Sequence, residues 1–188
     1  MRKIMFNDKY GLTKCVLEKK KTMTRRLIPE SLCKEWDELG HDEFDTLWDK
    51  AKYYKERAPF KVGEVIAVAQ SYKDLFGQDK NTHWFQDHAG WNNKMFVSAI
   101  NMKHHIKITG IKVERLQDIT EGESLKEGIH ERKVRPFDKI DMMYQVPNTP
   151  VLKPTAKEAF AVLIDKISGK GTWKLNPMVF AYSFELID

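Results

Sequence analysis

The chain has few cysteines, no long hydrophobic run and no leader-like start. Its 188 residues include only Cys15 and Cys33, with no Cys-x-x-Cys pair, which argues against a zinc site built on cysteine pairs. Two unpaired thiols fit a reducing compartment. No run approaches the roughly 18 apolar residues of a membrane span, and residues 1–6 lack the apolar core of a secretory signal. We therefore expect a cytoplasmic protein without membrane contact.

Histidine patterns typical of metal sites are also missing. His104 and His105 are adjacent in a segment that we expect to be a strand, so their side chains would point to opposite faces. His83 and His88 share a loop with Asp87, where solvated histidines are commoner than metal ligands. We expect no metal and no other cofactor.

The composition is that of one folded domain with a basic surface. Hydrophobic residues make up 41% and charged residues 31% of the chain, which is enough apolar material for a core in a chain of this length. The formal net charge is +5. This excess fits a phosphate-bearing or polyanionic partner, although a role in solubility explains it equally well.

Hydrophobic periodicity predicts strands mixed with helices throughout the single domain 1–188. Strands are expected at 2–6, 22–28, 62–69, 95–116 and 178–187, and helices after Asn7 or Asp8, within 30–57, at 120–128 and at 155–169. Residues 30–57, broken at Gly40, are interpreted as a helical insertion that covers one end of a barrel. Residues 74–93 are expected to be a long loop, and residues 130–153 to be irregular.

Local signals sharpen three of these expectations. The apolar parity changes at Gly110, which predicts a bulge in a strand. Thr120 with Glu123, and Thr155 with Glu158, form capping boxes that begin helices. Short strands with a bulge, mixed with helices, favour an α+β fold built on a small, mixed or mostly antiparallel β-barrel.

The segment from Lys19 to Arg26 carries the clearest chemical pattern. It marks the end of a helix and the start of an extended stretch, in which Thr22, Thr24 and Arg26 share one face. Arginine binds phosphate in a bidentate manner and threonine donates or accepts a hydrogen bond. Chemistry alone does not separate a ligand site from a solvated basic turn.

This segment resembles the G-x-K-x-x-T-x-R motif of the ASCH domain family, which has a PUA-like fold. Lys21, Thr24 and Arg26 occupy the K, T and R positions, whereas Lys19 replaces the motif glycine. Glycine there would permit a positive φ or a close approach of the backbone. Residues 62–68, 116–120, 125–128 and 176–184 resemble further segments of the family in the same order, and the details look most like its phage-associated and gut-bacterial versions.

The resemblance implies a basic cleft that binds RNA, a nucleotide or a nucleoside. Lys19, Thr22 and Arg26 would contribute to that cleft, and Gln70, Ser71 and Tyr72, which follow the buried strand, would line its mouth. Trp84, Phe85 and Trp91 could stack on bases, although loop aromatics more often pin a loop to its domain.

A related branch of the family hydrolyses the amide of acetylcytidine, and this gives an alternative function. Carried over by position, Lys21, Thr24 and Glu127 would be catalytic: a lysine of depressed pKa as base, a threonine nucleophile and an orienting glutamate. Glu123 competes for the glutamate role but has a capping function. A third hypothesis is a phage or mobile-element interaction protein that binds a protein partner through residues 30–57.

Overall fold

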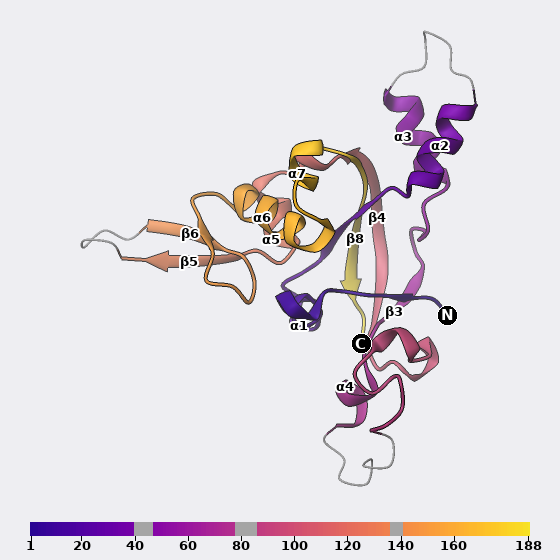
Figure 1. Ribbon diagram of the computed structural model, residues 1–188, viewed down its shortest axis with the longest axis vertical. Coiled ribbons are helices and arrows are strands. Elements are labelled where there is room, and N and C mark those ends of the chain that lie inside the picture. Colours follow the sequence, from indigo (N-terminus) through magenta and orange to yellow (C-terminus); the bar gives the residue numbers. More distant parts are fainter. Residues whose placement is uncertain (40–46, 78–85, 136–140) are drawn as a thin grey trace.

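The computed structural model describes residues 1–39, 47–77, 86–135 and 141–188, arranged in two sheets with helices packed around them (Figure 1). The larger sheet has the order β1-β3-β4-β8-β2, formed by β1 (Lys3–Ile4), β3 (Val65–Val68), β4 (His105–Arg115), β8 (Met178–Leu186) and β2 (Met23–Leu27). Only β1 and β3 are parallel, and the other neighbours are antiparallel. The fold is therefore mixed α/β.

A closed barrel is not detected in the described residues, so the expected PUA-like barrel is not confirmed. The five-stranded sheet ends in β1 on one side and β2 on the other. The strand β1 is only two residues long. It pairs with β3 on one side, and its other edge is too short to form a hydrogen-bonded ladder with β2 that would close the sheet. The sheet is open, and its edges are short.

The central strands β4 and β8 follow the sequence pattern closely. Their register shifts between Ile108 and Gly110, so the predicted bulge is confirmed. Ile106 and Ile108 are buried before it and Ile111 after it. The extra residue moves the apolar set to the opposite parity, which keeps one face of a long strand against the core.

Seven helices of the described residues surround the sheets. They are α1 (Leu12–Leu17), α2 (Glu30–Glu38), α3 (Leu47–Glu56), α4 (Tyr72–Phe76), α5 (Glu121–Lys126), α6 (Ala156–Ser168) and α7 (Thr172–Leu175). Thr120 and Thr155 accept hydrogen bonds from the backbone N–H of Glu123 and Glu158, as the capping boxes predict. The described parts of residues 30–57 are mainly helical, as α2 and α3, with Trp36 packed against Tyr53 and Tyr54, while the predicted break at Gly40 lies outside the described residues.

Two predictions of local structure are wrong, and a third is confirmed only in part. Residues 130–153 are not irregular but contain a second sheet of order β5-β6-β7, formed by β5 (His130–Val134), β6 (Asp141–Gln145) and β7 (Leu152–Lys153). The strand predicted at 95–116 begins only at His105, after the 3-10 turns Lys94–Phe96 and Ala99–Asn101. The predicted loop 74–93 overlaps the end of α4, whereas its described residues 86–93 form turns and bends as expected.

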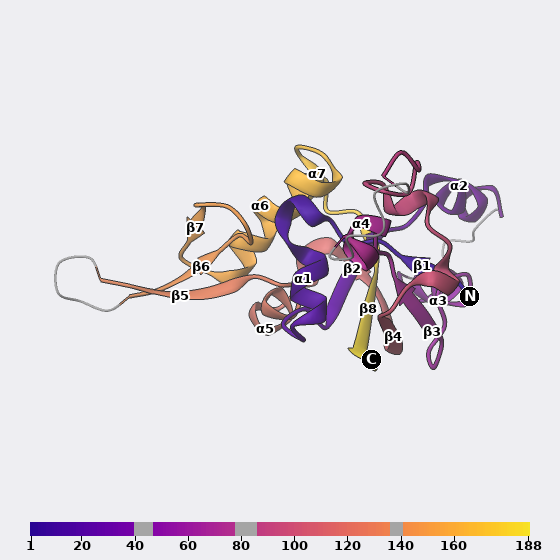
Figure 2. The ribbon, with the colours of Figure 1, turned by 90° about the horizontal axis from the view of Figure 1, so that it is seen from below.

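The strand β5 and the helix α4 were missed for different physical reasons. The charged strand β5 lies in a hairpin that projects from the body in both ribbon views (Figures 1 and 2), so both of its faces meet solvent and apolar alternation is not required. The helix α4 is only five residues long and owes its start to a capping box between Ser71 and Asp74.

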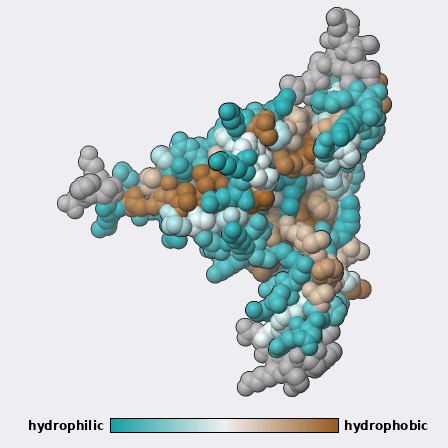
Figure 3. Space-filling view, viewed as in Figure 1, coloured by the Kyte–Doolittle hydropathy of each residue, from teal (hydrophilic) through white to brown (hydrophobic). Residues whose placement is uncertain are grey.

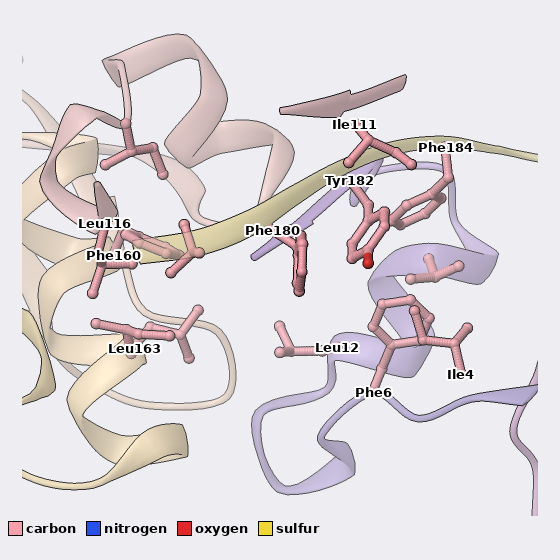
Figure 4. Close-up of a cluster of buried hydrophobic side chains, with 14 of the residues drawn as sticks. Ile4, Phe6, Leu12, Ile111, Leu116, Phe160, Leu163, Phe180, Tyr182 and Phe184 are labelled. Carbon is pink, nitrogen blue, oxygen red and sulfur yellow. The ribbon is translucent and has the colours of Figure 1, made fainter. Parts of the chain in front are cut away.

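The main core lies between the larger sheet, α1 and α6. Figure 4 shows Phe180, Tyr182 and Phe184 of β8 on the same side as Phe6 and Leu12, with Phe160 and Leu163 of α6 at the other end of the cluster. This packing places α6 and α1 on the two sides of the segment that carries the motif. Within the described residues, no helix combines the length and apolar character needed to cross a membrane.

Candidate functional site

Backbone hydrogen bonds join the end of α1, the start of β2 and the end of α5. The amides of Lys20 and Lys21 both donate to the carbonyl of Cys15, at 2.8 and 2.9 Å, and the amide of Thr22 donates to the carbonyl of Lys126 at 2.9 Å. The chain turns after α5 at Gly128, whose φ is +102°. A side chain there would be strained, so glycine brings Glu127 beside Lys21.

Lys21 and Glu127 form a buried ion pair. The Lys21 Nζ donates to Glu127 Oε2 at 2.6 Å and to the Glu127 carbonyl oxygen at 2.8 Å. The two side chains are 2% and 4% exposed. Burial lowers the pKa of Lys21, and the charge and hydrogen bond of Glu127 oppose that shift.

Arg25 holds the opposite side of Glu127. Its guanidinium donates to Glu127 Oε1 at 3.3 Å, to Glu114 Oε1 at 2.5 Å and to Glu123 Oε2 at 2.8 Å. Lys112 also donates to Glu123. Burial alone would raise the pKa of Glu123, but the bonds from Lys112 and the Thr120 amide, with the charges of Arg25 and Lys112, lower it to about 2.

A cavity of about 570 Å³ opens beside this pair, a volume within the range of small-molecule sites. Lys21, Thr24, Arg26 and Glu127 all line it, so the structure brings together the three motif residues and the glutamate that the alternative function requires. The remaining lining residues are Met5, Phe6, Asn7, Asp8, Leu12, Arg25, Leu27, Lys94, Phe160, Leu163, Ile164, Ile167 and Ser168.

Two lining groups retain unused hydrogen-bonding capacity. The hydroxyl of Thr24 has no partner among the described residues, although Thr24 is buried. Arg26 donates from Nη2 to the carbonyl of Met5, but its buried Nε has no partner in the described part of the chain. A buried donor without a partner costs about 1–3 kcal/mol, so Arg26 Nε is suited to a bound ligand. The Thr24 hydroxyl borders the same cavity and can donate or accept one hydrogen bond there.

Arg26 also differs from Arg25 in its charge environment. In the described ranges, Arg25 pairs with three carboxylates, whereas Arg26 forms no ion pair. Its guanidinium lies over the ring of Phe6, with 5.8 Å between Cζ and the ring centroid, and Lys21 Nζ lies 5.9 Å from the same centroid. Burial lowers the pKa of Arg26, and the charge of Glu127 opposes that shift.

Lys19 and Thr22 are close in sequence to the lining residues Lys21 and Thr24, but they do not line the cavity. Lys19 is exposed and has a φ of +57°. The turn therefore keeps the left-handed conformation that the motif glycine would favour, although a lysine occupies it. Thr22 is half-buried and pairs through its backbone with Lys126 and Phe184.

Gln70, Ser71 and Tyr72 lie at the end of β3 and do not line this cavity. The amide oxygen of Gln70 accepts from the backbone N–H of Lys103 at 3.2 Å, and Ser71 caps α4. These contacts give the first two residues structural roles. Of the aromatics considered for base stacking, Trp84 and Phe85 lie outside the described residues.

The sequence interpretation missed Arg25, Phe6 and the apolar wall from α6. Alternation in an extended segment placed Arg25 on the face away from Thr24, yet its long side chain reaches Glu127 and borders the cavity. The periodicity of α6 identified Leu163 and Ile164 only as core. No sequence signal connects Phe6 with a site.

No group of three or more metal-ligating side chains occurs in the part of the chain that the structure describes. Comparison with known proteins is also negative: no protein-family model, no curated protein and no solved structure matches this chain. The case for a function is carried by the cavity itself.

Proposed function

We propose that the chain is an ASCH-type domain that binds a nucleoside or nucleotide, either free or as an exposed unit of single-stranded RNA. One observation carries the proposal. Lys21, Thr24, Arg26 and Glu127 share one cavity, and in that cavity the buried Arg26 Nε has no hydrogen-bond partner among the described residues.

The chemistry of the lining matches the parts of a nucleotide. Arg26 offers a cation and a free N–H to a phosphate or carbonyl oxygen, and the ring of Phe6 offers an apolar surface to a base. The hydroxyl of Thr24 can donate or accept one hydrogen bond. A cavity of about 570 Å³ suits a single nucleotide unit better than a duplex.

Calorimetric titration with cytidine, adenosine, their 5′-monophosphates and a short single-stranded RNA tests this proposal. Arg26→Met should weaken binding of the monophosphates roughly 10-fold or more, because a hydrogen bond to a charged group contributes about 1.5–3 kcal/mol. Arg132→Met, at an exposed arginine on β5, is the matched control and should leave binding unchanged. Absence of binding by every nucleoside, nucleotide and RNA would refute the proposal.

Hydrolysis of an acylated nucleoside such as acetylcytidine is the second candidate. Burial lowers the pKa of Lys21, and the unpaired Thr24 hydroxyl borders the same cavity. In this reaction the Thr24 oxygen would attack the amide carbon while its proton passes to neutral Lys21. The leaving amine would then take a proton, and water would release the acyl group.

Two contacts favour binding over this chemistry. The two hydrogen bonds from Lys21 Nζ to Glu127 stabilise the charged ammonium, and the bond from Arg25 to the other carboxylate oxygen holds Glu127 in place beside Lys21. Both oppose the neutral lysine that a base requires. Incubation with acetylcytidine tests the alternative: Thr24→Ala should abolish cytidine release, whereas Thr22→Ala, a matched hydroxyl outside the cavity, should not. Absence of release by the wild type would refute it.

A further inference from the structure

Four polar residues outside the motif and its carboxylate also line the cavity. They are Asn7, Asp8, Lys94 and Ser168. Lys94 lies in the 3-10 turn Lys94–Phe96, far along the chain from segment 6–8. Its Nζ and Asp8 Oδ2 are 2.7 Å apart, and its side chain is 14% exposed. A turn from another part of the chain thus holds one wall of the cavity.

The three N–H groups of the Lys94 ammonium are all used within the protein. Besides Asp8, Lys94 Nζ donates to the carbonyl oxygen of Phe6 at 2.5 Å and to Oγ1 of Thr13 at 3.3 Å. A lysine ammonium has three N–H groups, so these partners match them one for one. Thr13 also donates to Asp8, which joins α1 to the same cluster. Lys94 is therefore suited to fix segment 6–8 and not to bind a phosphate.

Lys3 holds the turn from its other side. Its Nζ donates to the carbonyl oxygens of Lys94, Met95 and Val97, at 3.0, 2.7 and 2.7 Å. Lys3 belongs to β1 and does not line the cavity. We call these two lysines the lysine clasp, because Lys3 binds the turn to β1 and Lys94 binds the segment just after β1 to the turn.

We propose that the lysine clasp positions segment 6–8 as the wall that receives the base, with Lys3 and Lys94 as positioning residues. The inference rests on the proposed function, which places a base against Phe6. Both lysines act through segment 6–8 and neither supplies a bond to the ligand. The clasp makes a turn that follows a long loop a part of the site.

Segment 6–8 depends on the clasp because the chain leaves the core there. The ring of Phe6 packs on Phe184, with 5.7 Å between the centroids, but Asn7 is half-buried and Asp8 is exposed. Without the clasp, a ligand would have to order these side chains when it binds. Its affinity would fall by the cost of that ordering, whether or not it carries a phosphate.

Titration of cytidine, adenosine and their 5′-monophosphates against clasp variants tests the inference. Lys94→Met combined with Asp8→Asn opens the clasp and leaves the net charge unchanged, so the loss of a charge does not disturb the comparison. This double variant should weaken binding of nucleoside and monophosphate by the same factor, roughly 3- to 10-fold, the cost of ordering one side chain. Lys94→Arg retains donors for the same acceptors and should bind as the wild type does.

Lys3→Met should weaken binding of nucleoside and monophosphate alike, although Lys3 lies outside the cavity. It leaves every cavity residue in place, so it keeps the test decisive if the double variant does not fold. Lys9→Met is the matched control, because Lys9 is an exposed lysine of the same N-terminal stretch, and it should leave binding unchanged.

A loss confined to the monophosphates would mean that Lys94 binds phosphate directly, and it would overturn this inference. Unchanged affinity in the Lys3 variant or in the double variant would overturn it as well. Each of these results leaves the proposed function intact. Failure of the wild type to bind any of the nucleosides or nucleotides would overturn both.

Discussion

Replacement of Glu127 by glutamine should leave Lys21 as a buried cation without a charged partner. Glutamine has nearly the same shape, so the packing around α5 changes little. Arg25 retains Glu114 and Glu123, so the loss falls mainly on Lys21, whose side chain is 2% exposed. Breaking a buried ion pair by removing one partner destabilises a protein by about 3–5 kcal/mol.

The pH dependence of this loss identifies its cause. An ordinary lysine pKa is 10.5, and the interval from there to pH 7 corresponds to about 4.8 kcal/mol, the most that keeping Lys21 neutral can cost at pH 7. Where Lys21 of the folded Glu127→Gln variant is neutral, the unfolded chain still binds the Lys21 proton. The free energy of unfolding of the variant therefore rises with pH in this interval. Between pH 7 and pH 9 the variant should recover up to about 2.7 kcal/mol relative to wild type.

Urea unfolding at pH 7 and pH 9 measures both quantities, and a double-mutant cycle with Lys21→Met isolates the pair. The coupling free energy should reach about 2–3 kcal/mol. Glu18→Gln is the matched control, because Glu18 and Lys20 are also 2.6 Å apart but exposed, and it should barely move the unfolding midpoint. Additive single variants, or an equal loss at both pH values, would refute the reasoning.

Three further predictions concern the same region. Affinity for a nucleoside monophosphate should fall as pH rises through the lowered pKa of Lys21, because the ammonium loses its charge. The rate of amide hydrolysis with neutral Lys21 as base would instead rise. Binding titrations and rate assays from pH 6 to 10 separate the two. Because the pKa of Glu123 is about 2 rather than 4.5, the stability that it contributes should be full above pH 4.5 and decline toward pH 2. Glu123→Gln should abolish roughly 1 kcal/mol of that decline after solvent screening, as measured by unfolding at pH 3 and pH 6. Lys19→Gly should stabilise the fold by about 0.5–1 kcal/mol by relieving a left-handed residue, and Lys20→Gly, at a position without positive φ, should destabilise it.

Much of the fold could be predicted from the sequence where local signals and burial agree. The helix α5 begins at a capping box and α6 at the N-cap residue Thr155, and α6 repeats apolar residues at helical spacing, so their positions follow from propensity and periodicity. The bulge near Gly110 follows from a change of parity in a strand buried on one face. In each case the residues that form the local sequence pattern are also those that the packing of the core requires at those positions.

The remaining parts depend on pairings that a single sequence does not encode locally. The strand β5 is charged and lies in an arm that projects from the body, whereas β6 contains Met142, Met143 and Tyr144, and Figure 3 shows hydrophobic residues along this arm. The pattern of β6 is short and does not alternate strictly, so it does not identify a strand. Closure into a barrel depends on whether β1 and β2 meet, and those strands are edges of an open sheet instead. Long-range pairing of short strands is decided by the whole fold.

At the candidate site, too, local patterns predicted some residues, whereas others were placed by long-range contacts. The motif predicted Lys21, Thr24 and Arg26 as cavity residues, and backbone bonds between α1, β2 and α5 place Glu127 beside them. Alternation misplaced Arg25, because a long side chain can reach across to a carboxylate that the strand geometry alone would put out of range.

Arg25 determines what the neighbouring groups can do. Glu127 lies between the buried cations Lys21 and Arg25, and Arg25 also pairs with Glu114 and Glu123, whereas Arg26 forms no ion pair in the described part of the chain. Arg26 therefore presents a cation to the cavity, which suits an anion or a carbonyl oxygen. We accordingly favour binding as the function of this geometry, and hydrolysis would require a ligand whose arrival separates Lys21 from Glu127.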